Sequence, residues 1–247
     1  MKLYNKHSLK KIKKAFFDAL SNYDKETLDV LLTSKDIKYP ININEYDNYY
    51  STPLLWAASF GSLDSVKYLL ESDDISPKTD IYIKNEEGEN AFLCAVKNNK
   101  LDTVKYLLYT PTLKECFDIN STSTKGYNAL VYSLHNSHHE ITKYLLSSTD
   151  INVHHRSNNN GWTPLRSAIL RENSSIIQHL LFDKNVEFNN YDILWLTSYS
   201  NKSSEYTNYV LDLLNKRETY YRVNNEILNK KNESSFLLEN KNLKRKI

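Results

Sequence analysis

Apolar and polar residues follow a helix–turn–helix pattern that is clearest in Ser51–Leu70, which reads STPLLWAASFGSLDSVKYLL. Thr52 is a residue type that caps helices, and Pro53 fits the first helical position because no backbone bond is lost there. Gly61 can end this helix, since glycine adopts the left-handed conformation without steric cost. The apolar residues after Gly61 recur with the spacing of one helical face. The stretch therefore predicts two short helices that cannot bury both apolar faces alone.

The same pattern recurs three more times. The residues that correspond to Thr52 are Asn90, Asn128 and Thr163, at spacings of 38, 38 and 35. All four are good N-cap residue types. The apolar pattern of the second helix stays in register at 66–70, 104–108, 143–146 and 178–181. Fixed periods of this size indicate a solenoid of stacked helix pairs. We expect helices to begin near the four capping residues, with turns near Gly61, Asn99 and Ser137.

These segments resemble the ankyrin repeat, whose pattern joins T-P-L-H-L-A-A to V-x-x-L-L and D-V-N. Asp118-Ile119-Asn120 and Asp150-Ile151-Asn152 match the D-V-N segment, and the resemblance covers roughly residues 24–214. The positions of the family's hairpin glycine are occupied by Gly88, Gly126 and Gly161, and by Tyr50 in the first clear repeat. The resemblance implies an all-α solenoid of stacked helix-turn-helix units with short β-hairpin-like tips.

The pattern predicts four segments along the chain. Residues 1–39 form an N-terminal capping helix pair, in which Leu28 precedes Val66 by the same 38 residues. Lysines on its first helix provide the polar outer face that a terminal repeat needs. An alternative is that this lysine-rich helix lies on an anionic membrane. Residues 40–190 contain the regular repeats, residues 191–228 a degenerate C-terminal capping repeat, and residues 229–247 a polar basic tail that we expect to be flexible.

Charge is unevenly distributed along the 247 residues. The net charge is +2, but residues 1–20 carry +5 and residues 229–247 carry +4, so the body between them is −7. An acidic body is a poor surface for phosphate backbones, which argues against a nucleic-acid partner. No apolar run reaches the ~18 residues of a membrane span, and the charged N-terminus does not resemble a secretory signal. We expect a cytoplasmic protein; delivery into another cell stays open.

Few residues suggest chemistry. Cys94 and Cys116 are expected to be free thiols in a reducing compartment. A cluster with metal-like spacing is formed by His135, His138, His139 and Glu140. It straddles a predicted turn, where polar residues are common, and no further ligand with fixed spacing accompanies it. The sequence contains no nucleophile elbow, P-loop or zinc-protease motif. We therefore expect no metal, no cofactor and no enzymatic activity.

The repeat frame also predicts a surface for a partner. In ankyrin proteins the hairpin tips and the exposed ends of the first helices line the concave face. Partner-binding candidates at the tips are Tyr49, Glu86, Glu87, Glu89, Tyr127 and Trp162, and those at the helix ends are Phe60, Lys97, His135 and Arg171. Aromatic and arginine side chains dominate interface hot spots. The alternative is that the rings pack on the neighbouring repeat.

The resulting functional prediction is non-enzymatic recognition of another protein by a monomeric scaffold or adaptor. The acidic second tip favours a partner that presents basic residues beside an apolar anchor. If these positions are free of packing roles, their substitution should leave unfolding nearly untouched. A structural or self-associating repeat protein without a specific partner is the alternative, and an enzyme or metal-binding protein is a third possibility.

Overall fold

A computed structural model describes most of the chain up to residue 184 and short parts beyond it. The described residues are 6–33, 41–47, 50–60, 62–73, 75, 77–110, 113, 116–158, 161–184, 186, 192, 195, 207–219 and 222. The chain divides into two compact units, Met1–Ser167 and Ala168–Ile247.

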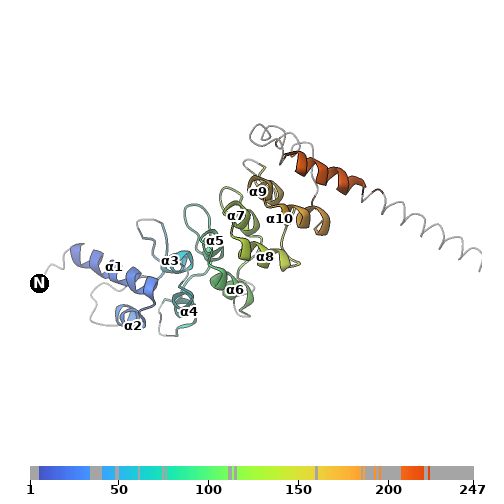
Figure 1. Cartoon of the computed structure of the whole chain (residues 1–247). Helices are drawn as coiled ribbons and strands as arrows, with labels where there is room; N and C mark the ends of the chain where they lie inside the picture. Colours follow the sequence, from blue (N-terminus) through green and yellow to red (C-terminus); the bar gives the residue numbers. More distant parts are fainter. Residues whose placement is uncertain are drawn as a thin grey trace, which may run out of the picture. The chain divides into compact units, whose positions relative to one another are not determined.

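Short helices make up almost all of the regular structure (Figure 1). In chain order they are α1 (Lys6–Asn22), α2 (Lys25–Thr33), α3 (Pro53–Phe60), α4 (Leu63–Glu71), α5 (Ala91–Lys97), α6 (Leu101–Tyr109), α7 (Ala129–His135), α8 (His139–Ser147), α9 (Pro164–Leu170), α10 (Ser174–Gln178) and the π-helical turn η1 (His179–Asp183). A further helix spans residues 207–219. Among the described residues the only β pairing is an isolated antiparallel bridge between Thr122 and Asn128. The all-helical fold expected from the sequence is confirmed.

The four predicted helix starts are confirmed, together with the side chains that cap them. Asn90 and Asn128 accept backbone N–H bonds from Leu93 and Val131 at 3.0 and 2.9 Å. The hydroxyl of Thr163 accepts from the Arg166 N–H at 3.1 Å, and that of Thr52 accepts at 3.5 Å in α3. Each bond satisfies one of the N–H groups that a helix leaves unpaired at its start. The same kind of capping hydrogen bond therefore begins the first helix of all four repeats.

The turns inside the repeats use the left-handed backbone conformation. Asn99 and Ser137 follow α5 and α7 with φ of +59° and +60°, where the sequence predicted turns. Gly61, the third predicted turn, lies outside the described residues. At the hairpin tips, Gly88 has a φ of +71°, and Tyr50, which replaces the glycine in the preceding repeat, has a φ of +54°. A non-glycine residue is uncommon in this region. The tip geometry is thus kept even where the glycine is absent.

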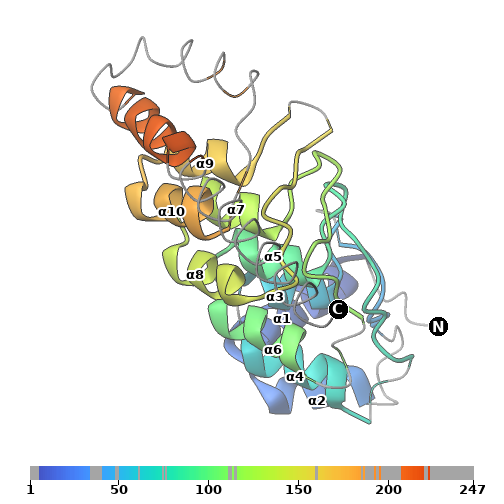
Figure 2. The same cartoon turned by 90° about the vertical axis from the view of Figure 1, so that its right-hand side faces the viewer.

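Within Met1–Ser167 the helices form two rows. Figure 1 shows α1, α3, α5 and α7 in one row and α2, α4, α6 and α8 in the other. Each first helix contacts the next one along its row, and α6 contacts both α4 and α8. In Figure 2 the connecting loops extend to one side of both rows. All six residues from Ala91 to Val96 in α5 are buried, because this helix lies between α3 and α7. The core is therefore a series of interfaces between repeats.

Asparagine side chains join the loops of successive repeats. The amide of Asn44 donates to the Lys78 carbonyl at 3.0 Å and accepts from the Asp80 N–H at 2.8 Å. Asn120 makes the equivalent pair with Asp150 and Asn152, both at 2.7 Å. These two asparagines stand 76 positions apart, twice the repeat period of 38. Between them the equivalent position carries a tyrosine, so the series is interrupted at one repeat.

Restoring this series should stabilise the protein. Tyr82 occupies the interrupted position and is 69% exposed. Tyr82→Asn would place an amide opposite the Cys116 carbonyl and the Asp118 N–H, as Asn44 faces the next loop. We expect the free energy of unfolding in urea to rise by about 0.5–1 kcal/mol. Tyr82→Ala is the matched control, because it removes the ring without supplying the amide. An equal gain in the control would show that the new hydrogen bonds are not the cause.

The unit Ala168–Ile247 contains α10, η1 and the helix at 207–219. Gln178 donates to the Tyr209 hydroxyl at 3.1 Å, and Arg217 donates to the Leu181 carbonyl at 3.1 Å. These bonds join the 207–219 helix to the end of the last clear repeat. The predicted segment boundaries near residues 39, 190 and 228, and the tail at 229–247, lie outside the described residues. They stay predictions.

Candidate partner-binding surface

The hairpin tips of the second and third repeats are directly joined. The carbonyl oxygen of Glu87 accepts from the backbone N–H and the hydroxyl of Thr124, at 2.8 and 2.9 Å. Lys125 lies 3.3 Å from the Glu87 carboxylate. A Cβ at Gly88 would lie 2.9 Å from the Thr124 nitrogen, so glycine permits this close approach. The next loop joins the same series, since the His155 ring nitrogen lies 2.6 Å from the Gly126 carbonyl. The tips therefore form a connected edge.

A buried carboxylate lies beneath this edge. The side chain of Glu89 is 2% exposed. It accepts hydrogen bonds from the Tyr132 hydroxyl at 2.6 Å, from Asn85 at 2.9 Å, and from Lys97 at 2.9 and 3.1 Å. Lys97 also pairs with Glu87 and lies 5.8 Å from the Tyr132 ring centroid. Glu89 was expected to contact a partner. The structure instead places it inside the fold. The four donated hydrogen bonds are needed there, because a buried carboxylate is costly unless it is hydrogen-bonded.

Electrostatics favour the charged forms of Glu87 and Lys97 at neutral pH. The hydrogen bond from Lys97 lowers the pKa of the Glu87 carboxyl, and Lys125 lowers it further. Burial alone would lower the pKa of Lys97, but its bonds to Glu87 and Glu89 prevail and raise it. Burial and the bond to Glu89 raise the pKa of the Tyr132 hydroxyl. Lys97 is therefore an ammonium and Tyr132 a neutral donor, and both are held in place.

Aromatic rings continue the surface across the third and fourth repeats. Tyr127 stands edge-on to Tyr132 at 5.6 Å between centroids and lies 6.4 Å from His135. His135 in turn stands edge-on to Trp162 at 5.8 Å. The Trp162 indole N–H donates to the Ser167 hydroxyl at 2.6 Å. Edge-to-face pairs at these distances are attractive beyond their burial. Tyr127, His135 and Trp162 are all half-buried, so each ring both packs and meets solvent.

We name this region the tip surface and define it by six residues. They are Glu87, Lys97, Lys125, Tyr127, His135 and Trp162. All six belong to the unit Met1–Ser167. The surface combines a fixed acid, two lysines and three rings. It can offer apolar contact and charged hydrogen bonds to another molecule at one place.

The remaining candidates lie outside this group. Phe60 is 51% exposed and packs on Trp56 at 4.2 Å between centroids. Glu86 is exposed at the second tip, beside Glu87. Arg171 is exposed in the unit Ala168–Ile247 and is therefore treated apart from the tip surface. Tyr49 lies outside the described residues. Whether these residues contact a partner stays a prediction.

The family profile described as ankyrin repeats (3 copies) matches residues 16–115, 73–154 and 110–192, together well over half of the chain. The chain belongs to the ankyrin repeat family. Members of this family are generally protein–protein interaction modules and typically not enzymes. No individual curated protein matches the chain. The resemblance inferred from the repeated motifs is thus confirmed.

The sequence analysis missed one residue of this ankyrin-repeat surface, Lys125, and two residues beneath it, Tyr132 and Asn85. Tyr132 and Asn85 hold Glu89, and Lys125 pairs with Glu87. One signal was available for Tyr132. It falls at a buried position of the first helix, and a tyrosine hydroxyl in that place needs an acceptor nearby. No comparable signal marks Lys125, because lysines at loop tips are common.

Two other properties of the ankyrin-repeat chain follow from its described residues. In that part of the chain no three His, Cys, Asp or Glu side chains gather as metal ligands would, at the histidine cluster after α7 or elsewhere. No helix described here has the length and apolar character needed to cross a bilayer.

Proposed function

We propose that this ankyrin-repeat protein binds another protein non-covalently, with the tip surface as the main contact. The observation that carries the proposal is the continuous contact from Tyr127 through His135 to Trp162, beside Lys125 of the third tip and Lys97 at the end of α5. Half-buried rings that are held by their neighbours offer contact area, and these side chains lose little conformational freedom on binding. Aromatic residues are also the ones most enriched in interface hot spots.

The chemistry of the surface indicates the kind of partner. Lys97 and Lys125 neutralise Glu87, so that tip is less acidic than the sequence suggested. Glu86 is exposed and has no ion-pair partner among the described residues. An apolar or aromatic anchor against Trp162, with a basic group near Glu86, would complement these features. The proposal thus keeps the partner expected from the sequence and, of the three predicted acidic contacts Glu86, Glu87 and Glu89, assigns the main one to Glu86.

The proposal describes a scaffold or adaptor that acts as a monomer in the cytoplasm, without catalysis. Both cysteines are free thiols, which fits a compartment that keeps thiols reduced. Burial raises the pKa of the Cys94 thiol to about 12. Such a thiol is a poor nucleophile, because the thiolate is the reactive form.

Sedimentation of the purified chain tests the oligomeric state, and a dimer at micromolar concentration would favour a self-associating repeat protein.

Trp162→Ala tests the binding role. Proteins retained by the wild-type chain under native conditions would be identified, and the affinity of the most abundant one measured by calorimetry. We expect the substitution to weaken that affinity by about 2 kcal/mol or more, the size of a hot-spot effect. Because Trp162 also bonds to Ser167, we expect it to cost ~1–2 kcal/mol of stability as well. Trp162 therefore has a packing role, contrary to the expectation from the sequence that its substitution would leave unfolding nearly untouched.

Two further variants accompany Trp162→Ala, one as a control and one as a test of the acidic contact. Tyr46→Ala removes an exposed aromatic ring outside the tip surface and should leave affinity unchanged. Glu86→Ala should mainly slow association and reduce its salt dependence, because exposed charges at a rim act on the encounter. Equal affinity of the wild-type chain and the folded Trp162→Ala variant would overturn the proposal.

A further inference from the structure

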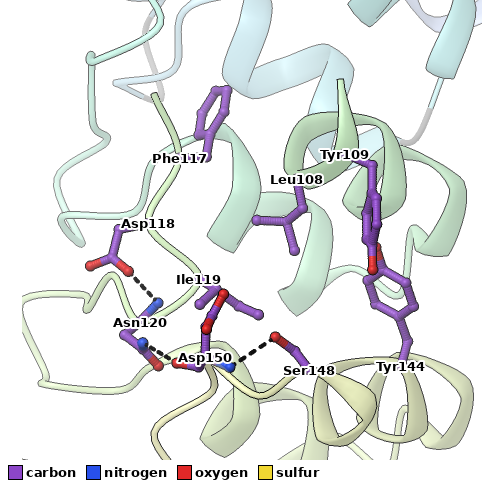
Figure 3. A pocket seen from close by; sticks show the side chains of 9 residues that line it. All are labelled: Leu108, Tyr109, Phe117, Asp118, Ile119, Asn120, Tyr144, Ser148 and Asp150. Carbon is purple, nitrogen blue, oxygen red and sulfur yellow. Dashed lines mark hydrogen bonds between the residues drawn. The ribbon is translucent and has the colours of Figure 1, made fainter. Parts of the chain in front are cut away.

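A second candidate site lies between α6, α8 and the loops that follow them (Figure 3). It is a pocket of about 490 Å³ within the unit Met1–Ser167. Leu108, Phe117 and Ile119 supply apolar walls, and Tyr109 and Tyr144 supply aromatic ones. The pocket shares no residue with the tip surface. Its size falls in the range of sites that hold one small molecule or one long side chain.

An interrupted pattern explains the aromatic wall. Tyr68, Tyr106 and Tyr144 recur every 38 residues on the second helices. The Tyr68 hydroxyl donates to Asp29 at 2.6 Å, and the Tyr106 hydroxyl donates to Glu71 at 2.7 Å. Each tyrosine thus reaches a carboxylate of the preceding repeat.

One repeat further along, the position of Glu71 is occupied by Tyr109. Its ring lies 5.9 Å from that of Tyr144, with 51° between the planes. The buried hydroxyl oxygen of Tyr144 therefore lacks the carboxylate that its counterparts have. Tyr109 itself is 72% exposed. The exchange of an acid for a tyrosine leaves two aromatic rings side by side at the edge of an open pocket, as Figure 3 shows.

Two carboxylates complete the lining, and neither is neutralised within the described residues. The Asp118 carboxylate accepts the Asn120 N–H at 2.8 Å, and the Asp150 carbonyl accepts from the Asn120 amide at 2.7 Å. The Asp150 N–H donates to the Ser148 hydroxyl at 3.2 Å. These bonds, drawn in Figure 3, fix the two loops and place no positive charge against the carboxylates.

The aromatic wall also attracts cations. Lys105 lies 5.8 Å from the centroid of the Tyr144 ring, and Lys67 lies 5.7 Å from that of Tyr106 one repeat earlier. Neither lysine lines the pocket. An ammonium or guanidinium group near a tyrosine face is stabilised by the charge distribution of the ring. Rings and carboxylates in one pocket thus select the same chemistry in a ligand, which is a cation on an apolar stem.

We propose that this pocket between α6 and α8 binds the side chain of an arginine presented by a partner protein. The guanidinium stacks on Tyr109 or Tyr144 and donates to Asp150, and the aliphatic stem lies on Leu108 and Ile119. Arginine fits better than lysine, because its planar fork pairs with carboxylates and stacks on rings at the same time. The site is a second contact point, independent of the tip surface.

N-acetyl-arginine amide tests this proposal with the full chain, followed by NMR shifts of the labelled protein. We expect saturable shifts in residues 117–120 and 144–150. N-acetyl-citrulline amide, which has nearly the same shape but no charge, should bind at least about tenfold more weakly. Equal binding of the two compounds, or no saturable shift with either, would overturn the proposal.

Variants assign the contacts. Asp150→Asn should weaken arginine amide binding at least about tenfold, and Tyr109→Ala should weaken it several-fold. Asp73→Asn is the matched control, because this exposed acid pairs with Lys78 away from the pocket, and it should change nothing. Wild-type affinity in the Asp150→Asn variant would rule the site out.

A truncation identifies the source of the cation. Residues 229–247 carry six basic residues, so the chain itself could supply the ligand. If the arginine comes from another protein, a chain ending at 228 binds the probe as the full chain does. A marked gain in affinity on truncation would show that the chain's own tail fills the pocket, and the proposal of a partner arginine would be wrong.

Discussion

Leu107→Ala is expected to lower the free energy of unfolding by about 2–5 kcal/mol. Leu107 is fully buried in α6, which contacts α4, α5 and α8. Truncating it removes apolar contact and leaves a cavity that the surrounding helices can close only in part. Urea denaturation followed by circular dichroism gives the value. In a solenoid this loss also weakens the coupling between neighbouring repeats, so the transition should become broader.

Tyr109→Ala is the matched control in the same helix. This side chain is 72% exposed, and its loss should change stability by no more than about 0.5 kcal/mol. A cost below about 1 kcal/mol for Leu107→Ala would contradict the packing described for α6. A large loss in both variants would instead indicate that the end of α6 contributes more than its exposure suggests.

Glu89→Ala should destabilise the protein by about 2–3 kcal/mol. The substitution leaves Tyr132, Asn85 and Lys97 without the acceptor that they share. Removing one member of a buried ion pair can cost ~3–5 kcal/mol. Here the cost is smaller, because the Lys97 side chain is 35% exposed and water can still reach its ammonium. Thermal and urea unfolding of the variant test the value.

Two further measurements test whether the loss of stability is specific to the buried carboxylate and comes from its bond to Lys97. Glu86→Ala removes an exposed carboxylate three positions away and should cost less than about 0.5 kcal/mol. In a double-mutant cycle, Lys97→Ala in the Glu89→Ala background should cost much less than in the wild-type chain, because the two side chains act as one unit. Additive effects would mean that the Glu89–Lys97 bond contributes nothing measurable.

Local signals explain why the fold could be predicted from the sequence. The caps at Asn90 and Asn128 and the left-handed turns at Asn99 and Ser137 depend on residues within a few positions of each other. Their repetition at a fixed period identified the stacking, since a single helix pair cannot bury its own apolar faces. Short-range chemistry and periodicity together were sufficient for the architecture.

The candidate sites depend on longer-range contacts. Glu89 precedes a helix and resembles a free tip residue, but it is buried by Tyr132, which lies 43 positions away. The sequence analysis placed Trp162 at a hairpin tip and His135 at a helix end, and it did not predict the contact between their rings. The pocket depends on Tyr109 occupying the position of Glu71; the spacing of 38 gives this equivalence, but the bond from Tyr106 to Glu71 and the contact of Tyr109 with Tyr144 are known only from the structure. Side-chain partners across repeats could not be read from spacing alone.

Amide hydrogen exchange of the chain, with and without its captured partner, tests the central claim most directly. If the tip surface is the main contact, the partner slows exchange at 86–88, 125–127 and 161–162 and at the ends of α5 and α7. Residues 25–33 in α2 should exchange as in the free chain. Protection confined to other parts of the chain, with these three tips unchanged in a saturated complex, would contradict the account.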